Sequence, residues 1–179
     1  MKDNNLKISI IVPVYNEQDS LHELYKEIKE NIDIRYSWEL IFINDGSFDL
    51  SKNNILDLMK NDSNVKLINF YKNCGKSEAL NTGFNMCSGD IIVTLDADLQ
   101  DDPKEIDKFI NKIQEGYGLV TGWKKYRLDS ISRKFLSKIF NFILRFISNI
   151  KIHDFNCGYK AYSKSAINTI QIYGGLHRY

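Results

Sequence analysis

The chain has 179 residues, of which 43% are hydrophobic and 26% are charged. This size and composition fit one globular domain with a sizeable core. The formal net charge is +1, so no overall positive field indicates a nucleic-acid partner. The three cysteines are too few and too far apart for a disulfide framework or a structural zinc site. No uninterrupted apolar run of about 18 residues predicts a transmembrane helix.

Short runs rich in Ile and Val alternate with longer stretches of helical periodicity. The runs predict strands at 6–14, 38–44, 65–70, 90–95 and 119–122. The stretches predict helices at 17–32, 49–60, 77–87 and 102–115. Asn16 is the expected N-cap of the first helix, and Asp102 followed by Pro103 opens the last. This order predicts an α/β fold, a Rossmann-like, mostly parallel sheet flanked by helices, with ligands bound at the carboxyl ends of the strands.

Two acidic residues follow the fourth predicted strand directly. Asp96 and Asp98 are two positions apart in an extended segment, so their side chains project to the same side. Such a pair can hold a hard cation, Mg²⁺ or Mn²⁺, and Gln100 could assist. The alternative is a solvated acidic turn, and for Asp101 and Asp102 we prefer it because a helix start explains them.

The familiar phosphate-binding loops are absent from the sequence. The turn after the first predicted strand contains no glycine, which a dinucleotide-binding motif requires. Gly75-Lys76-Ser77 has Phe70 where a P-loop needs glycine. A nucleotide diphosphate bound here would therefore need another source of positive charge, and a metal ion on Asp96 and Asp98 could supply it.

The order and spacing of these segments resemble the family 2 glycosyltransferases, which have the GT-A fold. The segments that carry the resemblance are 11–17, 44–47, 73–83 and 96–103. Two later segments, 153–160 and 176–179, look like the polyprenyl-phosphate branch of that family. This branch includes dolichyl-phosphate mannosyltransferases and bacterial undecaprenyl-phosphate sugar transferases.

The resemblance implies a site for a UDP- or GDP-sugar donor. The donor-binding residues that it implies are Pro13, Tyr15, Glu17, Asp45, Lys76, Asp96, Asp98 and Gln100. Asp45 would face the base, while Asp96, Asp98 and Gln100 would hold Mg²⁺ or Mn²⁺ beside the diphosphate. Taken singly, Asp45 also fits a plain turn, Glu17 a helix N-terminus and Lys76 a solvated loop charge.

A basic cluster follows the fifth predicted strand, and the branch carries basic residues in this region that hold the acceptor phosphate. The residues expected in this role are Lys124, Arg127, Arg133 and Lys134. The segment 132–149 then predicts an amphipathic helix with a narrow basic arc and a wide apolar arc. Such a helix suits a membrane interface, although a helix packed against the sheet is the alternative.

We therefore expect an inverting, metal-dependent glycosyltransferase that acts on a polyprenyl phosphate at the cytoplasmic side of the membrane, as a peripheral protein. A phosphate monoester has a second pKa of about 6, so it needs little help from a general base. A glycan hydroxyl acceptor would need a base, and Asp154 is the candidate. Besides Asp154, the expected catalytic residues are Asp98 and Asp96. A non-catalytic nucleotide-binding or membrane-adaptor domain is the third interpretation.

The resemblance also sets an expected domain organisation. The whole chain, 1–179, would be one catalytic domain, truncated at its C-terminus. Its nucleotide-sugar half would cover about 6–122, and its acceptor and membrane-proximal part about 123–179. A homo-oligomer is compatible with the sequence, and no nucleic-acid partner is expected.

Overall fold

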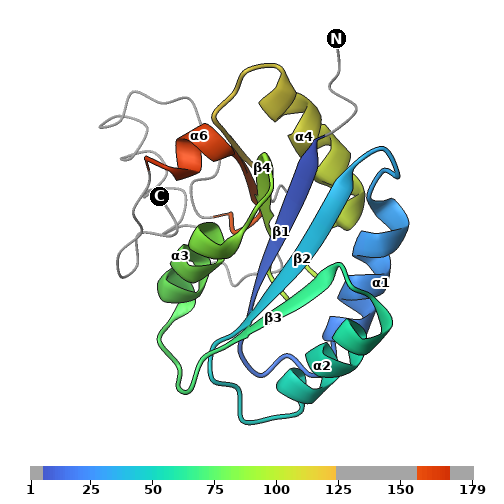
Figure 1. Ribbon diagram of the computed structural model, residues 1–179, viewed down its shortest axis with the longest axis vertical. Coiled ribbons are helices and arrows are strands. Elements are labelled where there is room, and N and C mark those ends of the chain that lie inside the picture. The colour runs from blue at the N-terminus through green and yellow to red at the C-terminus, as the bar shows by residue number, and fades with distance from the viewer. Residues whose placement is uncertain (1–5, 124–156, 170–179) are drawn as a thin grey trace, which may run out of the picture.

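The computed structural model describes residues 6–123 and 157–169 of the chain. It has three layers, a central sheet with α1, α2 and α4 on one face and α3 and α6 on the other (Figure 1). The strands are β1 (Lys7–Val14), β2 (Ser37–Asn44), β3 (Val65–Asn69), β4 (Ile91–Thr94), β5 (Leu119–Thr121) and β6 (Lys160–Ser163). The helices are α1 (Leu21–Asn31), α2 (Ser51–Asn61), α3 (Lys76–Met86), η1 (Pro103–Glu105), α4 (Ile106–Gln114) and α6 (Lys164–Ile167).

The sheet has the strand order β3-β2-β1-β4-β6-β5. β1 pairs in parallel with β2 and β4, and β2 pairs in parallel with β3. β6 is antiparallel to both β4 and β5, so β5 again runs in the direction of β4. The predicted mostly parallel sheet and its five strands are confirmed, whereas β6 is a strand that the sequence analysis misses.

Each face of the sheet has its own apolar layer. Side chains alternate along a strand, so β1 places Ile10 and Val12 in the layer shared with Leu24 of α1. Ile11 points to the other face and packs in the layer that contains Leu80 of α3. Burying a side chain of this size contributes roughly 1.5–3 kcal/mol, so both layers hold the strands firmly.

The first helix begins later than the sequence predicts. α1 starts at Leu21, and Asn16 does not cap it. Asn16 instead has a φ of +58°, the left-handed conformation that Asn tolerates better than most residues. The cap at Asp102 is confirmed, because its side chain accepts a hydrogen bond of 3.0 Å from the N–H of Lys104. The delayed start of α1 leaves residues 15–20 as a loop at the end of β1.

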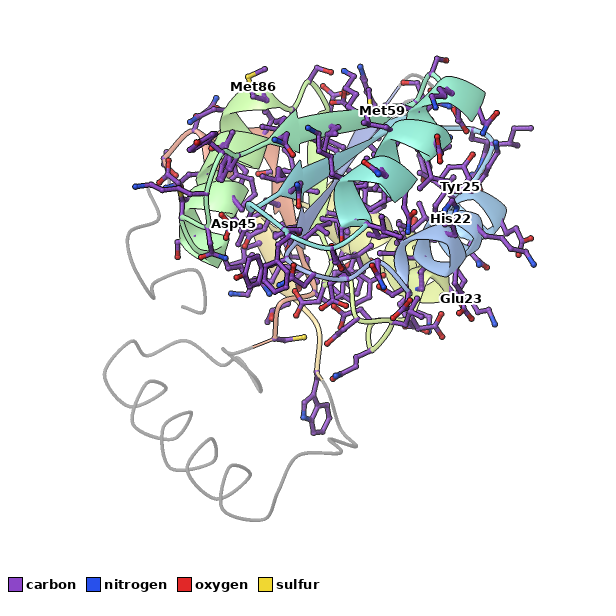
Figure 2. The ribbon with its side chains drawn as sticks, turned by 90° about the horizontal axis from the view of Figure 1, so that it is seen from below. His22, Glu23, Tyr25, Asp45, Met59 and Met86 are labelled. Atoms are coloured by element: carbon purple, nitrogen blue, oxygen red, sulfur yellow. The ribbon has the colours of Figure 1, made fainter. Side chains whose placement is uncertain are left out.

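β1 to β4 end at the lower edge of the sheet in Figure 1, and Figure 2 views the molecule from that side. The loops after these strands converge there, where the sequence analysis expects the ligand. Within the two described ranges, no helix is long and apolar enough to span a membrane. The predicted amphipathic helix at 132–149 lies outside the described residues and stays a prediction.

Candidate functional site

A cleft of about 330 Å³ opens at the carboxyl end of the parallel strands. This volume is at the lower end of the range for small-molecule sites. Seven of the eight predicted donor-binding residues line it: Pro13, Tyr15, Glu17, Asp45, Lys76, Asp96 and Asp98. Four further residues line the cleft and were not among the predicted donor-binding residues, namely Val14, Asn73, Gly75 and Ala97. The structure thus gathers the predicted residues in one place, while their binding roles stay predictions.

Hydrogen bonds join the loop after β1 to the loop after β2. The N–H groups of Asn16 and Glu17 donate to the hydroxyls of Ser47 and Ser51, each at 2.9 Å. In return, the side-chain oxygen of Asn16 accepts from the N–H of Phe48 at 3.0 Å. Because these two loops form one wall of the cleft together, neither is expected to move independently.

Aromatic rings lie at the rim of that wall. Tyr15 is 45% exposed, and its ring meets that of Phe48 edge to face, with the ring centroids 6.2 Å apart. Pro13 lies deeper, paired with Ile43 in the parallel ladder of β1 and β2. An exposed aromatic ring beside a polar cleft is a suitable surface for a planar base.

Asp45 fixes the next loop of the cleft (Figure 2). Its carboxylate is buried and accepts from the N–H groups of Cys74 and Gly75 at 2.7 and 2.9 Å. Gly46 has a φ of +71°, and a Cβ there would lie 2.4 Å from the carbonyl carbon of Lys72. Asp45 and Gly46 therefore hold residues 72–75 against the end of β2. Asp45 thus has contacts beyond those of a local turn, which was the alternative interpretation of this residue. Each carboxylate oxygen retains a lone pair that can face a ligand.

The acidic pair, Asp96 and Asp98, also lines the cleft. Asp96 follows the buried Leu95 at the end of β4 and forms an ion pair with the ammonium group of Lys76. Asp98 is exposed and accepts from the N–H of Gln100 at 3.1 Å. Gln100 is itself exposed and does not line the cleft, so its expected role as a ligand stays a prediction.

Two features around Asp96 were not predicted. A Cβ on Gly158 would lie 2.8 Å from both carboxylate oxygens of Asp96, so the backbone just before β6 packs closely against this side chain. Asp101 is only 4% exposed, and its carboxylate accepts from the N–H of Asp96 at 3.2 Å. The expectation of a solvated turn at Asp101 is wrong, because the chain folds this side chain under the loop. Asp102 does act as the expected helix start.

The cleft carries an excess of negative charge. Among the lining residues that the structure describes are four carboxylates, from Glu17, Asp45, Asp96 and Asp98, and a single ammonium group, from Lys76. Burial raises the pKa of Glu17, and repulsion from Asp98 and other nearby carboxylates raises it further. The cleft therefore favours cations.

The donor set fits a hard divalent cation that arrives with phosphate. In the part of the chain that the structure describes, no group of three or more His, Cys, Asp or Glu side chains is arranged to hold a metal ion. Asp96 and Asp98 are a pair of oxygen donors that line the cleft, and Asp98 is exposed. Mg²⁺ is commonly held in this way, by one or two carboxylates, with water and substrate phosphates as the other ligands.

Five predicted site residues lie outside the described residues. They are the proposed acceptor-phosphate ligands Lys124, Arg127, Arg133 and Lys134, and the candidate base Asp154. The described chain stops at Trp123, just beyond β5, and resumes at Cys157, just before Gly158. Their expected roles stay predictions.

Known proteins resemble the chain in sequence. The undecaprenyl-phosphate 4-deoxy-4-formamido-L-arabinose transferase of Salmonella choleraesuis is 37% identical over 166 residues, which are 92% of this chain and 51% of that protein. The protein of the same name from Salmonella paratyphi B matches equally well. The chain spans about half the length of these curated relatives.

Solved structures of glycosyltransferases resemble the chain in fold. Glucosyl-3-phosphoglycerate synthase from Mycobacterium tuberculosis, in complex with Mn²⁺, UDP and glucosyl-3-phosphoglycerate, has a TM-score of 0.71 at 21% identity, over 89% of this chain and 57% of that one. A mannosyltransferase from Pyrobaculum calidifontis, in complex with GDP-Man and Mn²⁺, has a TM-score of 0.69 at 18% identity, over 95% and 48%. The expected GT-A fold is confirmed. The family model for glycosyl transferase family 2 matches residues 9–171, and the chain belongs to that family.

Proposed function

We propose that the chain is the catalytic domain of an inverting glycosyltransferase that moves a sugar from a UDP- or GDP-sugar to a polyprenyl phosphate. The observation that carries the donor half is the cleft, where seven predicted donor-binding residues meet. The acceptor half is supported by the 37% identity to a transferase named for undecaprenyl phosphate. Membership of the family supports both halves.

The charge of the cleft supports a metal-dependent reaction. The described residues of the cleft carry four carboxylates and one ammonium group, which would repel a diphosphate without a counter-ion. Asp96 and Asp98 are the residues that would hold Mg²⁺ or Mn²⁺, with Gln100 close by in the chain. A bound divalent cation would supply charge stabilisation to the departing diphosphate.

Other residues of the chain bind and orient the donor. Asp45 keeps residues 72–75 against β2, which holds Lys76 at the start of α3 beside the cleft. Lys76 can then turn from Asp96 to a phosphate oxygen of the donor. Tyr15 and Glu17 line the same cleft, on a loop fixed by hydrogen bonds to the residues after β2. A preorganised wall of this kind lowers the barrier by positioning the reactants.

The acceptor end of the proposal rests on the sequence. Lys124, Arg127, Arg133 and Lys134 would hold the lipid phosphate, and the amphipathic segment 132–149 would lie on the cytoplasmic membrane surface. A phosphate acceptor is largely ionised near neutral pH, so no general base is required. Asp154 takes a catalytic role only if the acceptor is a hydroxyl group.

A donor and acceptor panel tests this function. The chain is incubated with radiolabelled UDP-sugars or GDP-mannose and Mn²⁺ or Mg²⁺, with and without undecaprenyl phosphate in detergent. We expect label in the lipid fraction only when the metal and the lipid phosphate are both present, and none after chelation with EDTA. Transfer to a glycan but never to the lipid would contradict the proposed acceptor. Nucleotide binding without turnover in every arm would contradict the proposed activity.

A further inference from the structure

Phe48 is an exposed aromatic residue beside the cleft. It lies in the loop after β2 and is 84% exposed. Its ring plane makes an angle of 85° with that of Tyr15, and Tyr15 lines the cleft. Phe48 itself is not among the lining residues. The ring that is suited to a planar base is therefore in contact with a second ring from another loop.

The backbone around Phe48 is fixed by hydrogen bonds to the loop after β1. The N–H of Phe48 donates to the side-chain oxygen of Asn16 at 3.0 Å. The N–H of Leu50 donates to the side-chain oxygen of Gln18 at 2.9 Å, and the N–H of Gln18 donates to the carboxylate of Asp49 at 3.1 Å. These bonds hold the loop in place on both sides of the Phe48 ring.

The backbone that carries Tyr15 is fixed as well. Asn16 follows directly, with the left-handed φ of +58°, and its N–H donates to the hydroxyl of Ser47 at 2.9 Å. A rare backbone conformation persists only where the surrounding contacts determine it. Both aromatic residues thus extend from fixed backbones, so removal of the Phe48 ring should leave the two loops where they are.

The Phe48 ring restricts a side chain that is otherwise partly free. Tyr15 is 45% exposed, so its ring could adopt more than one rotamer without a neighbour. Edge-to-face pairs are favourable at centroid separations of about 4.5–7 Å, and the 6.2 Å between these two rings lies in that range. The contact therefore orders Tyr15 before a ligand binds, which reduces the entropy lost when the ring packs against a base.

We propose that Phe48 is a positioning residue for the base of the donor nucleotide, because it holds the Tyr15 ring in the orientation that packs against the base. The inference rests on the proposed function, since it concerns the same donor cleft. Phe48 acts through Tyr15 and takes no part in holding the diphosphate.

A comparison of a nucleotide with pyrophosphate, which has no base, tests this role. Binding to the full chain is measured by isothermal titration calorimetry with Mg²⁺, using UDP or GDP, whichever the wild type binds. We expect Phe48→Ala to weaken nucleotide binding about three- to tenfold. Phe48→Tyr, which keeps a ring, should bind the nucleotide within about twofold of the wild type. Pyrophosphate binding should change by less than about twofold in both variants.

The matched control is Leu50→Ala. Leu50 is an exposed apolar residue of the same loop and does not line the cleft, so both affinities should stay within about twofold. In the transfer assay, Phe48→Ala should raise the KM for the donor and leave kcat within about twofold, because only binding of the base is affected.

Several outcomes contradict this inference alone. One is a Phe48→Ala chain that binds the nucleotide as tightly as the wild type. Another is an equal loss of nucleotide and pyrophosphate affinity, or an equal loss in Leu50→Ala, which would show a general distortion of the loop. Failure of both Phe48→Ala and Phe48→Leu to fold would show a structural side chain. A wild-type chain that binds neither UDP nor GDP contradicts the proposed function, and the inference with it.

Discussion

Carboxylates have different surroundings at the two ends of the parallel strands. We call the end where these strands begin the amino edge of the sheet, and the end where they finish the carboxyl edge. At the amino edge, Glu39 of β2 is 2% exposed and fully supplied with partners. It accepts from the Ser9 hydroxyl at 2.5 Å and from both the N–H and the hydroxyl of Ser88, and it pairs with Lys66 at 2.6 Å. Lys7 lies 3.7 Å away as a second cation. The charge of Glu39 is therefore neutralised within the fold.

At the carboxyl edge, negative charges outnumber positive charges among the described residues of the cleft. Glu17, Asp45, Asp96 and Asp98 share a cleft in which Lys76 is the only cation among the lining residues that lie within 6–123 and 157–169. The carboxylate at the amino edge connects β1, β2, β3 and the turn before β4, whereas the carboxyl edge leaves negative charge facing an opening. A carboxylate that is paired with cations inside the fold has a structural role. Carboxylates that outnumber the cations around them indicate a site where a ligand supplies the missing positive charge.

The largest effect that this comparison predicts is at Asp98. Asp98→Asn removes one of the two charges offered to the metal ion while keeping the side-chain shape. We expect the rate of sugar transfer to fall at least about 100-fold, as when an enzyme loses one group that stabilises the transition state. The measurement is initial rate at saturating donor and Mn²⁺.

Asp57→Asn is the matched control for this change. Asp57 lies on α2 and pairs with Lys60 in solvent, so its loss should leave the rate unchanged. Transfer by Asp98→Asn at a rate near that of the wild type would show that the charge surplus of the cleft is not used in the reaction.

Lys76 provides a smaller and more specific test. Its ammonium group neutralises Asp96 in the structure, so it competes with a cation for that carboxylate and is available to phosphate once a cation binds. Lys76→Met should tighten Mn²⁺ binding in the absence of nucleotide several-fold and weaken UDP or GDP binding about tenfold. Isothermal titration calorimetry measures both affinities.

The control for Lys76 is Lys72, in the loop that precedes α3. Lys72 is exposed and does not line the cleft, so Lys72→Met should change neither affinity by more than about twofold. Equal Mn²⁺ affinity for Lys76→Met and the wild type would mean that the ion pair with Asp96 plays no part in metal binding.

Much of this edge was predictable because its signals are local. Strand runs, the turn at Gly46 and the two acids after β4 each depend on a few consecutive residues, and parallel strands bring their ends together. The α/β fold followed from this, whereas the GT-A fold and the eight donor-site positions were implied by the resemblance to the family, and seven of those positions line the cleft. Asn16 was misplaced as a helix cap, because its hydrogen bond to Phe48 is made with a residue far away in the sequence.

The missed features have the same physical origin. β6 has only four residues, and its antiparallel pairing with β4 joins residues about 70 positions apart. No local pattern shows that Gly158 will meet Asp96 or that Asp101 will be buried. Leu99, two residues before Asp101, has a φ of +59°, a left-handed conformation that is rare for leucine and that no local pattern predicts. The positions of the acidic residues are read directly from the sequence. Their surroundings depend on contacts with residues far away in the chain, which the sequence does not show.

The smallest effect on the site is predicted for a substitution of Glu39 at the amino edge. Burial alone would raise the pKa of Glu39, but hydrogen bonds from Lys66, Ser9 and Ser88 outweigh it and lower the pKa to about 2. Because this is below the ordinary value of 4.5, the folded state binds the proton more weakly than the unfolded state. The stabilisation is therefore complete above the unfolded pKa and is lost as the pH falls through 4.5 towards about 2.

Glu39→Gln should accordingly lower the free energy of unfolding by about 1–2 kcal/mol at neutral pH, and the loss should shrink as the pH falls below about 4. Donor and metal affinities should stay within about twofold, because no residue of this cluster lines the cleft. Urea unfolding at several pH values measures the free energy of unfolding. Glu30→Gln, a substitution of an exposed glutamate, is the matched control. The contradicting result is a Glu39→Gln chain that folds normally but binds Mn²⁺ or nucleotide much more weakly. The two edges would then be coupled through the sheet, and the contrast between a structural edge and a ligand-binding edge would no longer hold.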